Sequence, residues 1–133
     1  MKRTNGSSPT KRDLLAVASF AEVLVPSSPT GRWHTEPDVT PYFEPTRGLA
    51  AFVYAVYERG VMLPFEWPAW QDEADRVESD DDLVAKADLE TIRRLITRTV
   101  RQDRVCEGAL AAWIADGRAS RALRRLGQLA CEA

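Results

Sequence analysis

Three carboxylates in this 133-residue chain have neighbours that could support acid–base chemistry. Glu66 stands between Phe65 and Trp67, and such apolar surroundings favour a protonated carboxyl group if no cation reaches it. Asp103 and Glu107 follow at a spacing of one helical turn. Because a protonated carboxyl group beside an ionised one can serve as acid and base, one hypothesis is a metal-independent hydrolase using these three residues.

The same carboxylates also fit a structural ion network, which is the interpretation we favour. Arg101 and Arg104 flank Asp103 in the sequence, so that their guanidinium groups could neutralise Asp103, Glu107 and Glu66. In that arrangement the carboxylates stabilise the fold and catalyse nothing. We therefore expect a binding protein rather than an enzyme.

Histidine and cysteine form no pattern typical of catalysis or metal binding. His34 is the single histidine, and Cys106 and Cys131 are not part of a Cys-x-x-Cys pair. A zinc site of cysteine and histidine and a Cys–His nucleophile are thus disfavoured, and the sequence holds no glycine-rich phosphate loop. We expect no metal, no cofactor and two buried free thiols.

Arginines concentrate in the last third of the chain and suggest recognition of phosphate. Nine arginines lie between residues 91 and 130, against three acidic residues. The phosphate-binding candidates are Arg94, Arg98, Arg121 and Arg125, with Arg101 and Arg104 beside them. On an ideal helix, the four arginines between residues 94 and 104 fall opposite the apolar side. Nucleic acid or a nucleotide phosphate would then be the partner.

An acidic segment that precedes these arginines gives the competing interpretation. Residues 66–90 hold ten acidic side chains and two basic ones. If residues 72–82 pack near the arginine-bearing helix, the result is a set of surface ion pairs worth about 0–1 kcal/mol each. The same acidic charge would repel a nucleic-acid backbone. We favour this pairing over phosphate recognition.

Aromatic side chains suggest either a core or a surface for a partner. Residues 63–70, Leu-Pro-Phe-Glu-Trp-Pro-Ala-Trp, combine three large aromatic side chains with two prolines that stiffen the backbone. We predict that the surrounding helices bury this segment as an aromatic plug. The candidates for a ligand or partner surface are Trp33, Tyr42, Trp67, Trp70, Arg101 and Arg104.

Helical periodicity dominates the elements that must position these residues. Apolar residues recur at helical spacing, as in Leu49, Phe52, Val53, Val56 and Tyr57, which we place on one buried face. The spacing predicts six helices, at residues 13–25, 46–59, 68–77, 89–106, 109–116 and 119–130. Thr10, at capping-box spacing from Asp13, and Asp88 are the predicted caps of the first and fourth helices. The last two helices, joined at a glycine, fit a helix-turn-helix or a simple packed hairpin.

The remaining segments are predicted to be irregular. Five prolines within residues 26–45 favour an extended strap laid over the helices, with room for a short strand pair. Residues 78–82, Glu-Ser-Asp-Asp-Asp, are predicted to form an acidic linker. The predicted fold is therefore a single all-α bundle, residues 12–131, after a disordered polar tail of residues 1–11.

Overall charge and hydropathy indicate a soluble domain. The 18 basic and 20 acidic residues nearly balance, so the total charge does not point to nucleic acid or an anionic membrane. No apolar run approaches the ~18 residues that span a bilayer. The N-terminus also lacks the apolar core of a signal peptide. We expect a cytoplasmic protein with no membrane partner.

Two motifs resemble those of a family of small bacterial proteins of unknown function. The motifs are residues 65–71, Phe-Glu-Trp-Pro-Ala-Trp-Gln, and residues 97–110, Thr-x-x-Val-Arg-x-x-Arg-x-Cys-Glu-Gly-x-Leu. The resemblance extends from about Arg32 to Leu126 and implies no activity. The function we predict is a binding module whose partner is a protein. Nucleic-acid or nucleotide-phosphate binding is the second hypothesis, and the hydrolase is the third.

Overall fold

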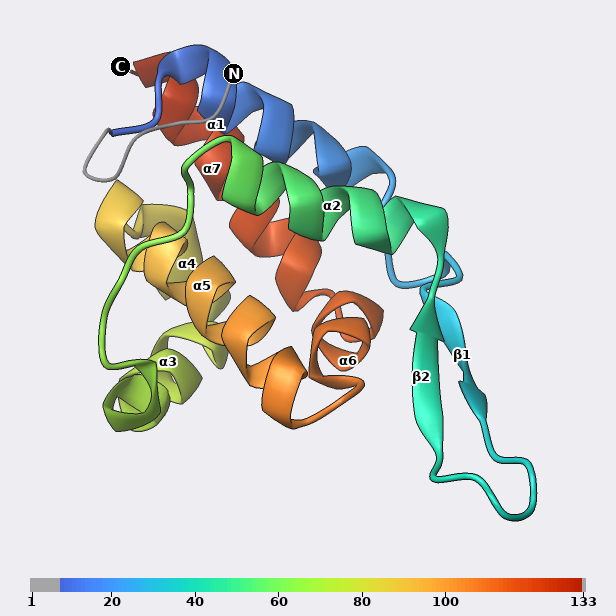
Figure 1. Ribbon diagram of the computed structural model, residues 1–133. Coiled ribbons are helices and arrows are strands. Elements are labelled where there is room, and N and C mark those ends of the chain that lie inside the picture. Colours follow the sequence, from blue (N-terminus) through green and yellow to red (C-terminus); the bar gives the residue numbers. More distant parts are fainter. Residues whose placement is uncertain (1–7, 133) are drawn as a thin grey trace.

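The computed structural model describes residues 8–132, which form a mostly helical fold with one small β-sheet (Figure 1). The α-helices are α1 (Lys11–Ala18), α2 (Arg47–Glu58), α3 (Gln71–Glu78), α4 (Asp81–Lys86), α5 (Leu89–Val105), α6 (Ala109–Ala115) and α7 (Arg118–Glu132). Short 3-10 helices are η1 (Ser19–Glu22) and η2 (Trp67–Trp70), and the strands are β1 (Gly31–His34) and β2 (Tyr42–Pro45). The helical prediction is confirmed, but an all-α fold is wrong because the strands pair.

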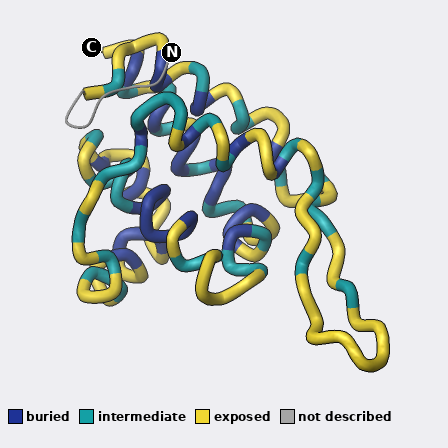
Figure 2. The backbone as a smooth tube through the Cα atoms, in the orientation of Figure 1, coloured by how far each residue is buried: buried dark blue, intermediate teal, exposed yellow. Residues whose placement is uncertain are grey.

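One apolar core lies among the helices, with α5 and α7 at its centre. Helix α7 contacts α1, α4, α5 and α6, and buried segments lie where these helices face one another (Figure 2). The largest fully buried side chains include Phe52, Ile92, Leu95, Ile96, Trp113, Leu123 and Leu126. Among the described residues, none of the helices combines the length and apolar character needed to cross a membrane.

Helix starts follow the predicted capping residues. The Asp13 N–H donates to Thr10 Oγ1 at 3.2 Å while the Thr10 N–H donates to Asp13 Oδ2 at 2.8 Å, which is a capping box. At the start of α5, Asp88 Oδ1 accepts the Thr91 N–H at 2.8 Å. The first α-helix is shorter than predicted, because it changes to 3-10 geometry at Ser19. Of the predicted tail, residues 1–7 lie outside the described residues.

The proline-rich segment forms the short strand pair for which the sequence left room, and it is a β-hairpin and not an extended strap over the helices. Its strands pair antiparallel, with Trp33 opposite Phe43 and His34 opposite Tyr42. The Trp33 and Phe43 rings meet edge to face, with centroids 5.4 Å apart, and such cross-strand pairs stabilise a hairpin. Prolines in the connecting loop need no ladder hydrogen bond. The hairpin projects away from the helices (Figure 1).

The predicted aromatic plug is not buried within the core, although Trp70 packs against the core from outside. Phe65, Trp67 and Trp70 are only half-buried, and residues 67–70 form a 3-10 turn rather than the start of an α-helix. The buried aromatic side chains are instead Phe52 and Trp113, each 0% exposed. Both stand on α-helices that face the core. The tryptophan-rich segment therefore covers the surface of α5 and does not organise the helices around itself.

Candidate functional site

The second sequence motif attaches the β-hairpin to the helices. The Phe43 N–H donates a 2.9 Å hydrogen bond to Glu107 Oε2. Gly108 has a φ of 94°, a left-handed conformation that favours glycine. A Cβ at Gly108 would lie 3.0 Å from Cζ2 of Trp33, so the indole packs where a side chain is missing. Glu107 and Gly108 thus join the hairpin to the turn before α6.

Asp103 organises the same turn from within α5. Its Oδ1 accepts the backbone N–H groups of Gly108 and Leu110, each at 3.1 Å. These donors lack partners at the start of α6 unless a side chain supplies one, so Asp103 acts as a helix cap. The structure therefore brings Asp103 and Glu107 to one turn and gives each carboxylate a backbone hydrogen bond.

Glu66 stands apart from the other two candidate catalytic carboxylates. It is exposed, and no hydrogen bond or ion pair joins its side chain to Asp103 or Glu107 within residues 8–132. Arg101 and Arg104 are also exposed, and neither forms an ion pair in the described part of the chain. A network of these arginines with the three carboxylates is consequently absent from residues 8–132.

His34 links acidic side chains within the hairpin. Its Nε2 lies 2.6 Å from Glu44 Oε1, and its Nδ1 lies 3.4 Å from Glu36 Oε1. The imidazole stacks on the Tyr42 ring, with centroids 4.5 Å apart. The hydrogen bonds to Glu44 and then Glu36 hold the pKa of His34 above its ordinary value of 6.5. The acidic partners therefore favour the imidazolium form.

Protonation of His34 is expected to stabilise the hairpin at mildly acidic pH. Because the folded-state pKa is raised, this stabilisation is complete below 6.5 and is lost as the pH rises through the folded-state value. Replacing Glu44 by glutamine keeps an acceptor oxygen but removes the negative charge that favours the imidazolium, and it should therefore lower the His34 pKa. An NMR titration of the His34 ring protons measures both values. A wild-type pKa at or below 6.5 would contradict this expectation.

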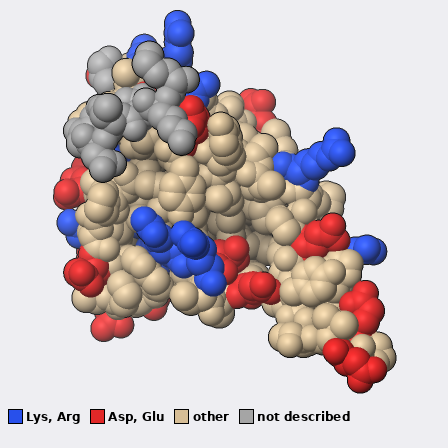
Figure 3. All heavy atoms as spheres, viewed as in Figure 1, with Lys and Arg blue, Asp and Glu red and all other residues tan. Residues whose placement is uncertain are grey.

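A cleft of about 380 Å³ separates the base of the hairpin from α2, α5 and α6. Its apolar lining comprises Phe43, Pro45, Leu49, Ala50, Val53 and Leu110. Asp103, Arg104 and Glu107 contribute charged groups to one side. Viewed from this side, basic side chains gather over α5, and acidic ones lie between them and the hairpin (Figure 3). The cleft combines an apolar lining with charged groups on one wall, as ligand and partner sites do.

Helix α2 continues this apolar surface beyond the cleft. Its buried side carries Leu49, Phe52 and Val56. Its outer side carries Ala50, Val53, Tyr54 and Tyr57, which we call the outer α2 stripe. Tyr54 is 68% exposed and Tyr57 is 41% exposed, although no charged residue occurs between residues 48 and 57. Because a helix that is apolar all round is normally covered on every side, this stripe is a candidate contact surface.

One member of the stripe lies outside the buried face that the spacing predicts. Tyr57 is exposed, whereas Val53 is half-buried, packs against the core and lines the cleft. The absence of charged residues from positions 48–57 is the sequence signal that both sides of α2 are apolar. An ordinary surface helix carries charges opposite its buried stripe.

The candidate phosphate-binding arginines do not share one open surface. Arg98 is 4% exposed, so the prediction that it lies on the outer side of its helix is wrong. Arg121 Nε lies 3.1 Å from Asp81 Oδ1. Arg125 donates to the Ala87 carbonyl oxygen at 2.9 Å and lies 3.9 Å from a carboxylate oxygen of Glu132. The acidic segment 72–82 supplies the partners of Arg98 and Arg121.

Arg98 is buried because Glu78, the last residue of α3, points into the core with it. Glu78 Oε2 accepts the indole N–H of Trp113 at 2.7 Å. Its Oε1 accepts hydrogen bonds from Arg98 and, at 3.2 Å, from Arg118. Three donors from α5, α6 and α7 thus satisfy one buried carboxylate, as buried charge requires. This cluster holds helices together and is closed to a ligand.

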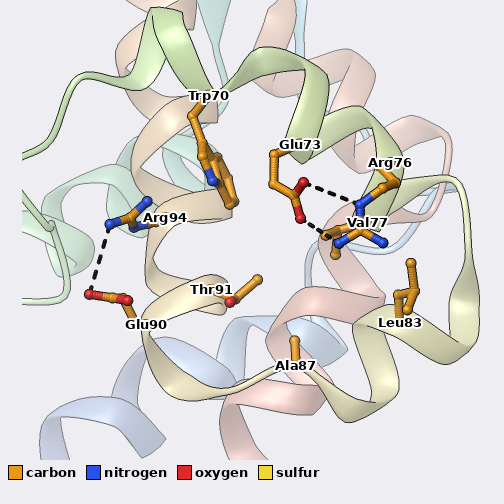
Figure 4. Close-up of a pocket in the computed structure, with 9 residues that line it drawn as sticks. All are labelled: Trp70, Glu73, Arg76, Val77, Leu83, Ala87, Glu90, Thr91 and Arg94. Atoms are coloured by element: carbon orange, nitrogen blue, oxygen red, sulfur yellow. Dashed lines mark hydrogen bonds and ion pairs between the residues drawn. The ribbon is translucent and has the colours of Figure 1, made fainter.

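The first sequence motif contacts Arg94 at a second pocket of about 220 Å³ (Figure 4). The Arg94 guanidinium carbon lies 4.9 Å from the Phe65 ring centroid and 5.8 Å from that of Trp70. Such positions allow cation–π attraction. The lining also contains the ion pairs Glu73 with Arg76 and Glu90 with Arg94. The pocket therefore has no surplus charge to recognise an ion.

The remaining candidates are cysteine and metal sites. Cys106 and Cys131 are both free and exposed, so the prediction of buried thiols is wrong. Cys106 follows the last residue of α5 as its C-cap, and Cys131 stands in the last turn of α7, where both side chains are exposed. Among residues 8–132, no three histidine, cysteine or acidic side chains gather closely enough to hold a metal ion.

Comparisons with known proteins identify a family but no activity. A family model described as a family of unknown function (DUF6508) matches residues 10–132. That range includes both motifs, the hairpin and all the helices described above. No curated protein matches the chain, and no solved structure matches it.

Proposed function

The chain belongs to this family of unknown function, and we propose that it is a protein-interaction module that binds through the outer α2 stripe and the adjoining cleft. The observation that carries the proposal is the exposed apolar side of α2. Tyr54 and Tyr57 offer large, stiff side chains that lose little conformational entropy on binding, and tyrosine is enriched at interface centres. Covering them would remove from water the exposed part of each side chain, which is 68% for Tyr54 and 41% for Tyr57.

The cleft supports the same proposal by extending the stripe inward. Ala50 and Val53 belong to both surfaces, so a partner lying on α2 reaches the cleft without crossing a charged residue. Phe43 and Leu110 also line the cleft, where they can contact an apolar side chain of a partner. Arg104 at the edge is exposed and can pair with a carboxylate of the partner. An apolar centre with a charged edge is the usual anatomy of an interface.

The predicted aromatic surface divides between two regions. Trp33 and Tyr42, 50% and 44% exposed, stand on the hairpin that borders the cleft. Trp67 and Trp70 belong to η2, where the Trp70 ring contacts Arg94. The hairpin pair can extend the proposed surface because Trp33 packs on Gly108, which lines the cleft. The η2 pair is not included in it.

The two alternative functions have less support. Phosphate recognition needs unpaired cations on one face, whereas Arg98, Arg121 and Arg125 already lie beside carboxylates of this chain. Hydrolysis by Asp103 and Glu107 needs carboxylates free to exchange protons, whereas both accept backbone hydrogen bonds that shape the turn before α6. These ion pairs and hydrogen bonds give the arginines and the two carboxylates structural roles within the fold.

Replacing Tyr54 by glutamate is expected to abolish partner binding and to leave the fold intact. The side chain is 68% exposed, so the core does not change, but binding would have to bury a carboxylate. Lysate of the native host is passed over wild-type and variant protein, and retained proteins are quantified by mass spectrometry. Proteins captured by the wild type should fall at least about tenfold with the variant.

A matched control separates this surface from unspecific charge effects. Ala85 is exposed on α4, so Ala85→Glu adds the same charge away from the outer α2 stripe. It should retain the proteins that wild type captures. Equal capture by wild-type and Tyr54→Glu protein would overturn the proposed function. Circular dichroism of all three proteins confirms that each is folded.

A further inference from the structure

Two charged residues at the ends of α2 are placed against the helix dipole. Arg47 is the first residue of the helix and Glu58 is the last. A helix carries partial positive charge at its N-terminus and partial negative charge at its C-terminus, so both side chains are unfavourable there. Within residues 8–132 neither forms an ion pair with another residue of the chain. A partner that supplies the opposite charges would relieve both ends.

The two charges also lie beside the outer α2 stripe. At 100° per residue, Arg47 lies about 20° and Glu58 about 40° from Tyr54 around the helix axis, on the same flank. Along the axis they are separated by 11 residues, or about 16 Å. A partner lying on the stripe therefore meets a positive charge at one end, a negative charge at the other, and no charge between them.

We propose that the partner covering the outer α2 stripe is a second copy of this chain, packed with its α2 antiparallel across a two-fold axis. The inference rests on the proposed function, because it names the partner of the same surface. A two-fold axis perpendicular to the helices brings Arg47 of each copy opposite Glu58 of the other. Each charge then also faces the dipole end that favours it.

Side-chain size supports the same register. The axis that pairs position 47 with position 58 places Tyr54 level with Ala51 of the other copy. Ala50 is the neighbour of Ala51 on the N-terminal side, and it lies within reach of Tyr57 of the second copy. Large rings thus face small side chains, and helices can approach closely. Because an isologous interface sets a surface against itself, a stripe without charge between residues 48 and 57 avoids like-charge contacts.

The test is sedimentation equilibrium across the micromolar range. Wild-type protein should form a dimer. Arg47→Glu and Glu58→Arg each oppose like charges at both ends of the interface, so each should raise the dissociation constant at least about tenfold. An equimolar mixture of these two variants should form a heterodimer near wild-type strength, because every pair across the interface is then opposite in sign. The double variant Arg47→Glu/Glu58→Arg should dimerise for the same reason.

Other outcomes overturn the homodimer. Wild-type protein that remains monomeric, single variants that dimerise like the wild type, or a mixture that does not associate would each contradict the antiparallel pairing. Tyr54→Glu should be monomeric, whereas Ala85→Glu should dimerise like the wild type. If the wild type is monomeric but Tyr54→Glu still loses captured proteins, the proposed function stands with another partner. If both experiments fail, neither proposal stands.

Discussion

Replacing Glu78 by alanine is expected to lower the free energy of unfolding by about 3–5 kcal/mol, the usual cost of breaking a buried ion pair. The substitution leaves Arg98, 4% exposed, without its carboxylate. It also removes Glu78 Oε2, which accepts a 2.7 Å hydrogen bond from the Trp113 indole N–H. A buried charge that loses its partner keeps its full desolvation cost and loses the attraction that offset it.

Urea denaturation followed by circular dichroism measures this loss. Glu73→Ala is the matched control, because Glu73 pairs with Arg76 on the same helix but at the surface. Water screens that pair, so its removal should cost far less stability. Glu78→Gln keeps an acceptor oxygen and should fall between the two variants. Equal losses for Glu78→Ala and Glu73→Ala would show that the buried cluster is not a principal support of the fold.

The sequence predicted those parts of the fold that local interactions determine. Thr10 and Asp88 cap α1 and α5 as their spacing indicates, because a capping side chain bonds to backbone only three residues away. The apolar residues of α5 that recur at helical spacing, such as Ile92 and Ile96, are also fully buried. Periodicity identifies such a face because one side of a regular helix repeats its contacts.

The charged cluster could not be predicted from periodicity. A helical wheel places Arg98 with the other arginines of α5, and Glu78 belongs to a run of acidic residues. Burial of the two became favourable only because α3, α5, α6 and α7 bring a carboxylate, an indole N–H and two guanidinium groups together. No local rule encodes contacts between residues 20 to 40 positions apart.

The half-buried position of the tryptophan-rich motif could not be predicted for a related reason. Its rings suggested a core, yet the Phe65 and Trp70 rings contact the Arg94 guanidinium on the surface of α5. An aromatic ring can be half-buried by a cation as readily as fully buried by aliphatic side chains. Composition cannot distinguish the two environments.

The candidate site, by contrast, was partly visible in the sequence. The uncharged residues 48–57, bounded by Arg47 and Glu58, are the longest uncharged run within any of the described α-helices. Periodicity alone does not reveal the outer α2 stripe, because an ordinary surface helix is apolar on one side only. The cleft itself depends on the hairpin, whose position is set by Glu107 and Gly108 on a different part of the chain.

Replacing Gly108 by alanine is therefore expected to release the hairpin and to widen the cleft. The left-handed conformation at φ 94° should cost a residue with a side chain about 1–2 kcal/mol. The new Cβ would also lie 3.0 Å from the Trp33 ring, so the indole has to move. Because Trp33 packs edge to face on Phe43, this shift pulls the Phe43 N–H away from Glu107.

Amide hydrogen exchange at Phe43 reports this release, since its N–H is held by Glu107 Oε2 at 2.9 Å. Exchange should accelerate in Gly108→Ala together with the loss of stability. Gly127→Ala is the control. Gly127 lies within α7, and a Cβ there would lie 3.5 Å from the Cβ of Ala18, an ordinary contact distance, so this substitution should cost no stability. If Gly108→Ala loses stability but amide exchange at Phe43 does not change, the loss of stability comes from backbone strain alone. The hairpin, and with it the wall of the cleft, would then depend on contacts other than the glycine.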